Sequence, residues 1–274
     1  MRRRPDVDDP RGRLTRDGIR IHEPADFAGM RTAGRLAAKI LDEVAALVEP
    51  GVPTEALDAF IEERVNAAGA KSATIGYRGY QHASCISVNH VVCHGIPGPK
   101  VLKDGDILNI DVTVIVDGWY GDTSRMYVAG TLARKAERLI QVTHDALMLG
   151  IEAVRPGRTF GDIGAAIQTY VEAQRMSVVR DFCGHGLGRV FHAPPNVLHY
   201  GRPGTAARLE EGMFFTIEPM VNLGRPETKV LADDWTAVTR DKSLSAQFEH
   251  SVGVTATGAE IFTLSPAGRF HPTR

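Results

Sequence analysis

The sequence has little cysteine, no long apolar run and almost no net charge. Its 274 residues include three cysteines and no CxxC pair, which argues against a disulfide framework, excludes a cysteine-rich structural zinc site and fits a reducing cytoplasm. No apolar run approaches the ~20 residues of a membrane helix, and no apolar stretch follows the charged first residues, so we expect neither a membrane span nor a secretory signal. A net charge of -1 provides no global field that would attract DNA, RNA or a membrane.

The remaining composition is that of a soluble globular protein, since 43% of the residues are hydrophobic and 24% are charged. A chain of this length can bury a large core. Residues 1–24 differ, because they are rich in Arg, Asp, Pro and Gly and show no apolar periodicity. We interpret them as a flexible N-terminal extension. Its arginines leave a transient contact with ribosomal RNA open, although a solvated tail is the simpler interpretation.

From residue 25 onward, the same order of elements occurs twice. Helical periodicity, a Pro-Gly turn, a second helix and several strands occur in residues 25–130 and again in residues 131–265. The predicted helices span residues 27–48, 55–68, 133–154 and 160–174. The predicted strands span residues 85–88, 91–94, 107–116, 119–128, 213–221 and 248–255. We therefore predict an α+β fold for one large domain of residues 25–270, with pseudo-twofold duplicated helix-helix-strand halves, a central antiparallel sheet and helices outside.

An acidic residue closes an apolar strand at the same place in both halves. Residues 102–114 return, 107 residues later, as residues 209–221, and Asp111 coincides with Glu218. An ionised carboxylate in such a place is costly unless a cation lies beside it. The alternative is that each acid lies alone at a solvated strand end, but the matching positions favour a shared site between the halves.

A tight turn is predicted to bring another carboxylate next to the first. If the Asp-Gly pair at residues 117–118 forms a hairpin turn, Thr113 faces Asp122. Asp111 and Asp122 are then diagonal neighbours on one face, about 7–8 Å apart at the backbone. Glu249 occupies a place in the second half that matches that of Asp122 approximately.

Four bare carboxylates at one site would repel one another and take up protons. Two divalent cations would balance their charges. His185, which is flanked by glycines, adds one nitrogen to this oxygen-rich set, as hard to borderline metals such as Mn, Fe or Co favour. A lone histidine is more often an ordinary polar residue, so the pattern of acids carries the prediction of a two-metal hydrolase.

Several short motifs resemble those of type I methionine aminopeptidases, which belong to metallopeptidase family M24 and have the pita-bread fold. The motifs are specific together although no single one is, and the resemblance covers about residues 25–265. They are Gly76–Tyr80, Cys85–Pro97, Asn109–Thr113, Gly121–Ser124, Cys183–Gly188, Phe191–Pro194, Thr216–Pro219 and Gln247–His250.

The resemblance implies a role for each matching residue. The metal ligands would be Asp111, Asp122, His185, Glu218 and Glu249, with Asp122 and Glu249 bridging. Catalysis would use Glu218 as general base, His192 as a donor to the scissile carbonyl and His94 beside the amide nitrogen. The substrate pocket would be lined by Thr74, Tyr77, Tyr80, Cys85, His94, Phe191, His192 and Trp235. A monovalent cation, Na or K, would lie at Asn89, Val91 and Ser245.

The activity implied is that of a methionyl aminopeptidase with a catalytic aminopeptidase domain of residues 25–270. It would hydrolyse the N-terminal methionine of nascent proteins and peptides that have a small second residue, by a metal-activated water. Two divalent ions (Co, Mn, Fe or Zn) would be its cofactors. The enzyme would be a cytoplasmic monomer without DNA or membrane partners, and a transient ribosome contact stays open.

Two alternatives accompany this prediction. One is an Xaa-Pro aminopeptidase or prolidase of the same fold, although these usually carry an additional N-terminal domain. The other is a non-catalytic relative that binds peptides or the ribosome, although such a protein should have lost metal ligands. Three positions also depart from the family pattern: Arg78 stands where many members have histidine, Thr74 where some have cysteine, and Ala193 is less polar than usual. These departures concern fine specificity rather than the chemistry.

Overall fold

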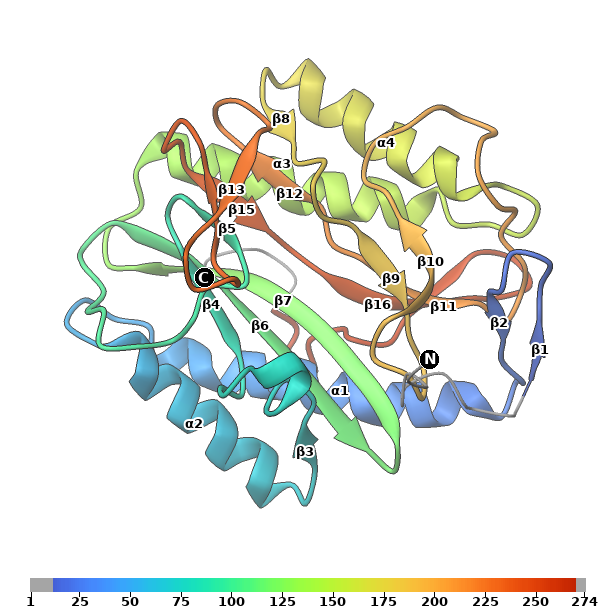
Figure 1. Ribbon diagram of the computed structural model, residues 1–274, viewed down its shortest axis with the longest axis horizontal. Coiled ribbons are helices and arrows are strands. Elements are labelled where there is room, and N and C mark those ends of the chain that lie inside the picture. The colour runs from blue at the N-terminus through green and yellow to red at the C-terminus, as the bar shows by residue number, and fades with distance from the viewer. Residues whose placement is uncertain (1–11, 270–274) are drawn as a thin grey trace.

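Two pairs of helices enclose the strands of the protein from opposite sides (Figure 1). The computed structural model describes residues 12–269, so residues 1–11 of the expected extension lie outside the described residues. The helices are α1 (Asp26–Val44), η1 (Ala45–Leu47), α2 (Thr54–Ala67), η2 (Tyr77–Gly79), α3 (Arg134–Glu152) and α4 (Phe160–Ala173). The four α-helices confirm the predicted ones to within a few residues. None of the described helices is both long enough and apolar enough to cross a membrane.

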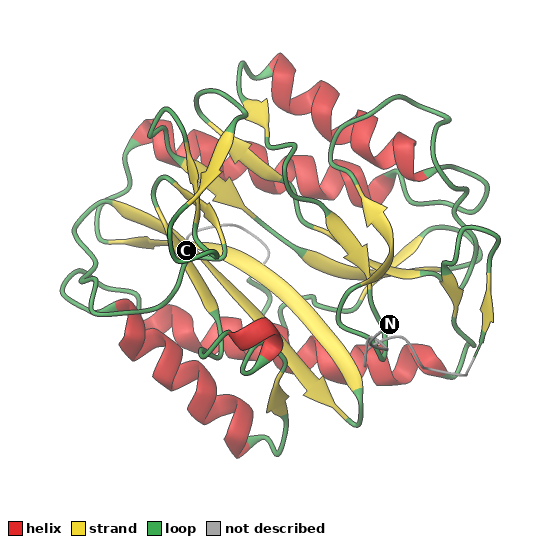
Figure 2. Cartoon of the chain, viewed as in Figure 1, coloured by secondary structure: helices red, strands yellow, loops and turns green. Residues whose placement is uncertain are grey.

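The strands lie between the helix pairs (Figure 2). In the first half they are β3 (Lys71–Ser72), β4 (Cys85–Val88), β5 (Val91–Cys93), β6 (Asp106–Val116) and β7 (Trp119–Ala129). In the second half they are β8 (Ser177–Val178), β9 (Gly184–Gly186), β10 (Ala193–Val197), β11 (Phe214–Ile217), β12 (Met220–Asn222), β13 (Thr228–Val230), β14 (Ala237–Thr239), β15 (Ser245–Gln247), β16 (His250–Val254) and β17 (Ala259–Ile261).

All pairings among the described strands are antiparallel, as predicted. The strand orders are β3-β6-β4 with β7 on β6, β10-β9-β11-β16-β17, β15-β12-β8 and β13-β14-β5. The last of these joins β5 of the first half to strands of the second. The α+β class and the repeated helix-helix-strand order are therefore confirmed.

β6 and β7 form a long hairpin in the predicted register. Thr113 pairs with Asp122 across it. Residues 117 and 118 form the turn with φ angles of 49° and 80°, the left-handed pair that suits the twist of the flanking strands. Because side chains alternate along a strand, Asp111 and Asp122 lie on one face of this hairpin.

Each helix pair covers its own hydrophobic core. The buried face of α1 includes Ala37, Ile40, Leu41 and Val44, the spacing of an amphipathic helix. These side chains pack with residues of α2, β4 and β6. A second core joins α3 and α4 to β11, β12 and β16 around the fully buried Phe215. The strands between the two cores are thereby supported from both sides.

Two predicted strands are shorter than expected, and each is limited by an acidic residue. Residues 213–221 form β11 and β12, with Glu218 and Pro219 between them. Glu249 separates β15 from β16, so the predicted strand 248–255 begins after it. Pro219 explains the first break because proline has no N–H group for a ladder hydrogen bond.

Residues 12–24 differ from the flexible extension that we expected. They contain a small hairpin of β1 (Arg13–Leu14) and β2 (Arg20–Ile21), seen at the edge of Figure 1. Ile19 is 1% exposed and belongs to the core of the second half. His22 stacks on Phe214 with ring centroids 4.2 Å apart. Strands of two residues carry no readable periodicity, so contacts distant in the sequence hold this segment in place.

Candidate metal centre and cavity

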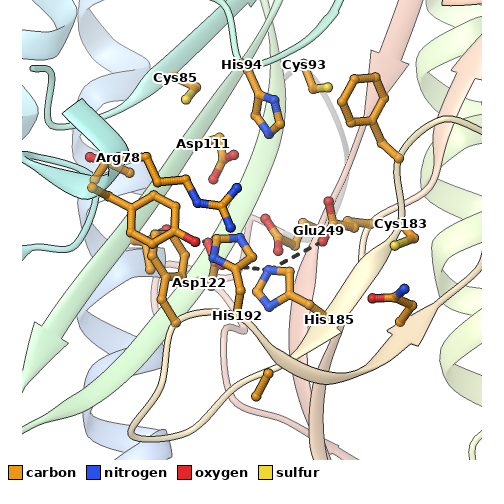
Figure 3. A pocket seen from close by; sticks show the side chains of 18 of the residues that line it. Arg78, Cys85, Cys93, His94, Asp111, Asp122, Cys183, His185, His192 and Glu249 are labelled. Carbon is orange, nitrogen blue, oxygen red and sulfur yellow. Dashed lines mark hydrogen bonds and ion pairs between the residues drawn. The ribbon is translucent and has the colours of Figure 1, made fainter. Parts of the chain in front are cut away.

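A cavity of about 700 Å³ contains most of the predicted site residues. From the first half it is lined by Thr74, Tyr77, Tyr80, Cys85, His94, Asp111 and Asp122. From the second half it is lined by His185, Phe191, His192, Glu218, Trp235 and Glu249. Figure 3 shows side chains of both halves pointing into this common space. All predicted ligand and pocket residues thus meet in one place.

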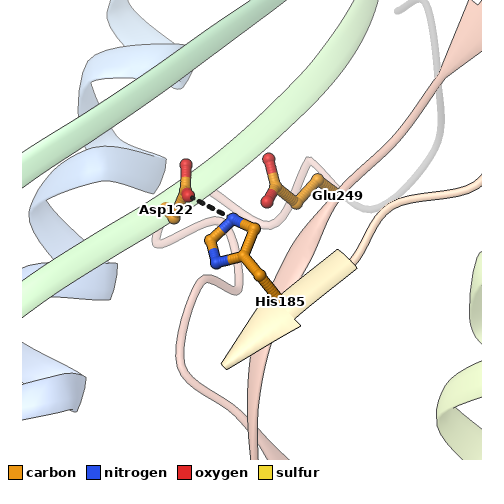
Figure 4. A group of neighbouring side chains, drawn as sticks. All are labelled: Asp122, His185 and Glu249. Carbon is orange, nitrogen blue, oxygen red and sulfur yellow. Dashed lines mark ion pairs between the residues drawn. The ribbon is translucent and has the colours of Figure 1, made fainter. Parts of the chain in front are cut away.

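Asp122, His185 and Glu249 form a compact group of candidate ligands (Figure 4). Each offers one ligand atom, and these atoms all lie within 4.8 Å of one another. The Nε2 atom of His185 lies 3.5 Å from Asp122 Oδ2 and 3.7 Å from Glu218 Oε1. Asp111 lines the same cavity from β6. The five predicted ligands therefore come from β6, β7, β9 and the two strand breaks.

Hydrogen bonds orient two of these carboxylates. The hydroxyl of Thr113 donates to Asp122 Oδ1 over 2.7 Å. The hydroxyl of Thr216 donates to Glu218 Oε1 over 2.8 Å, and the side-chain amide of Gln247 donates to Glu218 Oε2 over 3.3 Å. Each carboxylate is therefore restrained before any ligand binds.

Contacts between β7 and the start of β16 join the two halves beside the carboxylates. The N–H of Glu249 donates to the carbonyl of Ser124 over 3.1 Å. The hydroxyl of Thr123 donates to the carbonyl of Glu249 over 2.7 Å, and the hydroxyl of Ser251 donates to the carbonyl of Asp122 over 2.6 Å. Hydrogen bonds across the interface therefore fix Asp122 and Glu249 relative to each other.

In the metal-free protein, three carboxyl groups of the cluster have raised pKa values. Burial and then neighbouring carboxylates raise the pKa of Asp111 and of Glu249 well above the usual range. Burial raises the pKa of Glu218 to about 7, although His185 and a threonine hydroxyl act against it. Burial alone would lower the pKa of His185, but Asp122 and Glu218 outweigh it and the pKa is raised. The cluster therefore retains protons that a cation would displace.

This donor set fits a divalent metal ion. Four carboxylates and one imidazole supply oxygen and nitrogen, the donors of hard to borderline metals. Cys85 and Cys93 also line the cavity, but burial raises the pKa of both thiols. They are therefore protonated near neutral pH and compete poorly as ligands.

His94 and His192 stand on the wall of the cavity next to this cluster. Desolvation lowers the pKa of both imidazoles, and the charges of His185 and Arg78 lower that of His192 further. The ring of His192 lies 4.1 Å from that of His185, and His94 meets the ring of Trp235 edge-on at 6.1 Å. Both rings are therefore neutral near pH 7 and offer one hydrogen-bond donor and one acceptor each.

Another part of the cavity lining is aromatic rather than charged. This aromatic wall consists of Tyr77, Tyr80, Phe191 and Trp235. Tyr80 is 3% exposed, and its ring centroid lies 4.9 Å from that of Trp235. Its hydroxyl donates to the carbonyl of Ser84 over 2.9 Å. The hydroxyl of Thr74 is likewise engaged, with the carbonyl of His82. The hydroxyls of Tyr80 and Thr74 are thus satisfied, and the aromatic rings beside them suit a flexible apolar group.

The residues predicted to bind a monovalent cation lie outside the lining of this cavity. The N–H of Ser245 donates to the carbonyl of Asn89 over 2.9 Å. The side-chain amide of Asn89 bonds Asp106 and the N–H of Ile107. A cation at Asn89, Val91 and Ser245 stays a prediction.

Sequence reasoning missed several residues that support or line the site. His199 Nε2 accepts a hydrogen bond from the N–H of Glu218 over 3.0 Å, and burial lowers its pKa to about 3. No pattern in the sequence marks it. Thr216 and Gln247 stand inside matching motifs, but the motifs do not indicate their contacts. The cavity lining further includes Asp17, Cys93, Phe182, Cys183 and Met220.

Comparison with known proteins agrees with this geometry. Residues 28–256 match metallopeptidase family M24. The chain is 57% identical over 255 residues to a methionine aminopeptidase of Rickettsia prowazekii (strain Madrid E), covering 93% of this chain and 98% of the relative. It is 52% identical over 248 residues to a methionine aminopeptidase of Escherichia coli (strain K12), covering 90% and 94%.

Solved structures of the same fold include a methionine aminopeptidase and a prolidase. The crystal structure of methionine aminopeptidase from Rickettsia prowazekii superposes with a TM-score of 0.89 and 58% identity, covering 90% of this chain and 100% of that one. A prolidase from Pyrococcus horikoshii OT3 superposes with a TM-score of 0.71 at 19% identity, covering 89% of this chain and 63% of that one. The second similarity is one of fold alone.

Proposed function

The chain belongs to metallopeptidase family M24, and we propose that it is a methionine aminopeptidase, which hydrolyses the N-terminal methionine of nascent proteins and peptides with a small second residue. The observation that carries this proposal is the group of five donors from both halves beside an aromatic wall. Similarity to methionine aminopeptidases extends over nearly the whole chain and supports it further. We also propose that residues 25–270 are the catalytic domain and that the protein acts in the cytoplasm, since its three cysteines are free thiols.

We propose that two divalent ions (Co, Mn, Fe or Zn) bind to Asp111, Asp122, His185, Glu218 and Glu249. Asp122 and Glu249, which meet from different halves, would both take part in holding the ions. When bound, such ions supply Lewis acidity and lower the pKa of water toward neutrality. The side chains of this protein then have the tasks of orienting the substrate and moving its protons.

Glu218 is suited to the role of general base. Its carboxylate lines the cavity beside the other donors, and a positioned carboxylate can accept a proton and return it. Its two oxygens are held by Thr216 and Gln247, so the proton is taken up at a fixed place. The departing amine would then receive that proton from Glu218.

The neutral imidazoles are suited to the scissile bond. His192 lies next to His185 and can donate to the carbonyl oxygen as negative charge develops on it. His94 lines the same cavity and can steady the amide nitrogen. The aromatic wall would receive the methionine side chain, because a flexible thioether packs well against ring edges.

A peptide assay with defined metals tests this function. The protein is stripped with a chelator and reloaded separately with Co, Mn, Fe or Zn, and release of the first residue is measured from Met-Ala-Ser, Met-Leu-Ser and Ala-Pro-Ser. We expect methionine release from Met-Ala-Ser with at least one metal and none without. Absence of release under every metal would favour a non-catalytic binding protein. Release of alanine from Ala-Pro-Ser instead would favour an Xaa-Pro aminopeptidase.

A further inference from the structure

Arg78 brings an unneutralised positive charge to the mouth of the cavity. It lines the cavity and is exposed to solvent. In Figure 3 its guanidinium extends into the cavity beside His192. Within residues 12–269 it is the one lysine or arginine that lines the cavity.

Arg78 lies in a tight turn. Arg78 lies in η2 with φ 48° and ψ 30°, a left-handed conformation that is unfavourable for a residue with a side chain. The turn that imposes it is closed by the N–H of Gly76, which donates to the carbonyl of Tyr80 over 2.7 Å. The guanidinium carbon also lies 5.3 Å from the centroid of the Tyr77 ring, a cation–π contact that limits its movement.

No carboxylate neutralises this charge locally. Across residues 12–269, no acidic group lies within 4.0 Å of the Arg78 guanidinium. Asp17 and Asp181 also line the cavity without forming an ion pair with Arg78, and Asp181 accepts a hydrogen bond from the hydroxyl of Thr228 over 2.6 Å. Ala193, next to His192, adds only a methyl group to the lining. The acidic cluster deeper in the cavity would itself be neutralised by bound divalent ions.

We propose that Arg78 selects substrates by the charge of their third residue, favouring acidic and disfavouring basic side chains. This inference rests on the proposed function. If methionine occupies the aromatic wall and the scissile bond lies at the carboxylate cluster, the second residue is confined at that cluster. The third residue, one Cα spacing of ~3.8 Å further on, is the first whose side chain reaches the mouth. Peptides beginning Met-Ala-Asp or Met-Ser-Glu are thus the substrate class.

The test compares kcat/KM for Met-Ala-Asp-Ser, Met-Ala-Asn-Ser and Met-Ala-Lys-Ser. Asp and Asn have the same shape, so their ratio isolates charge. For the metal-loaded wild-type protein at low salt we expect an Asp:Asn ratio of about 2–5, the range of an exposed ion pair. The Asp:Asn ratio should approach 1 at an ionic strength of about 1 M, where the Debye screening length is only ~3 Å.

Four variants separate charge from structure. Arg78→Lys should keep the preference, Arg78→Gln should abolish it and Arg78→Glu should turn it toward the lysine peptide. Arg134→Gln is the matched control, because Arg134 is exposed at the start of α3 and does not line the cavity; it should keep the wild-type ratio. Ratios are taken within each variant, so a change in folded fraction does not alter them.

Two results would overturn the proposal. One is an Asp:Asn ratio of 1 in a wild-type protein that cleaves the Asn peptide normally, which would leave the aminopeptidase function intact. The other is a wild-type Asp:Asn ratio that persists in Arg78→Gln; if turnover also fell equally on all three peptides, Arg78 would be a general binding residue. Failure of the wild-type protein on every peptide would instead contradict the function itself.

Discussion

Glu218 accepts hydrogen bonds at both of its carboxylate oxygens. In the variant Glu218→Gln the side chain keeps its size but cannot accept a proton. We expect kcat for Met-Ala-Ser to fall by about 10²–10⁴-fold, the usual contribution of positioned proton transfer. The assay is run with saturating metal, and bound metal is measured in parallel. Near-normal turnover would exclude Glu218 as the base.

Tyr80 tests the assignment of the aromatic wall. Its ring contacts Trp235, while its hydroxyl donates to the backbone carbonyls of Ser84 and Gly95. Tyr80→Ala should lower kcat/KM for methionyl peptides by roughly 10–100-fold, because a pocket loses about 1–3 kcal/mol of differential binding. Tyr80→Phe, which keeps the ring, should lose much less. Equal turnover of peptides with N-terminal leucine and methionine by the wild-type protein would contradict the pocket.

The hairpin β1–β2 is expected to be part of the folded protein. Ile19 lies in the core, whereas Leu14 of the same hairpin is 56% exposed. Ile19→Ala should therefore lower the free energy of unfolding by about 2–5 kcal/mol, as for other core truncations. Leu14→Ala, the matched control, should change it by no more than about 0.5 kcal/mol. Equal effects in urea denaturation would mean that the hairpin is held loosely.

Elements with a local cause were predictable from the sequence. The hairpin β6–β7 follows from an Asp-Gly turn between apolar strands, and the register that this turn predicts places Asp111 and Asp122 on one face. The repeat, with its offset of 107 residues, likewise predicted that Glu218 matches Asp111 and belongs to the same site. The strand break at Glu249 and the support of Glu218 by His199 have no local cause. They arise where segments distant in the sequence pack together, so composition and periodicity do not reveal them.

Metal binding should stabilise the whole molecule, because the ligands come from both halves. At a metal concentration of ~100 Kd the expected gain is about 2.7 kcal/mol. The raised pKa values of Asp111, Glu218 and Glu249 mean that the metal-free folded protein keeps protons that the unfolded chain releases. Their protonation stabilises the metal-free protein at low pH, and this contribution is lost as pH rises through about 7 for Glu218.

The gain in Tm on adding manganese should consequently be larger at pH 8 than at pH 6, since at pH 6 the ion must displace more protons. Differential scanning calorimetry of chelator-treated protein measures this at both pH values. Asp122→Asn, which removes one ligand that the first half supplies, should lose most of the gain. A gain that is the same at both pH values would show that the carboxylates are already ionised.

Hydrogen bonds join Glu249 to Ser124 and Thr123 within one chain, so the assembly of the centre does not depend on protein concentration. A polypeptide of half this length would supply the ligands of only one side of the centre. It would have to dimerise with a second copy to complete the site. Its specific activity would fall as it became scarce. Covalent fusion of the two halves supplies the missing side at a fixed, high effective concentration, so each molecule remains competent however few are present.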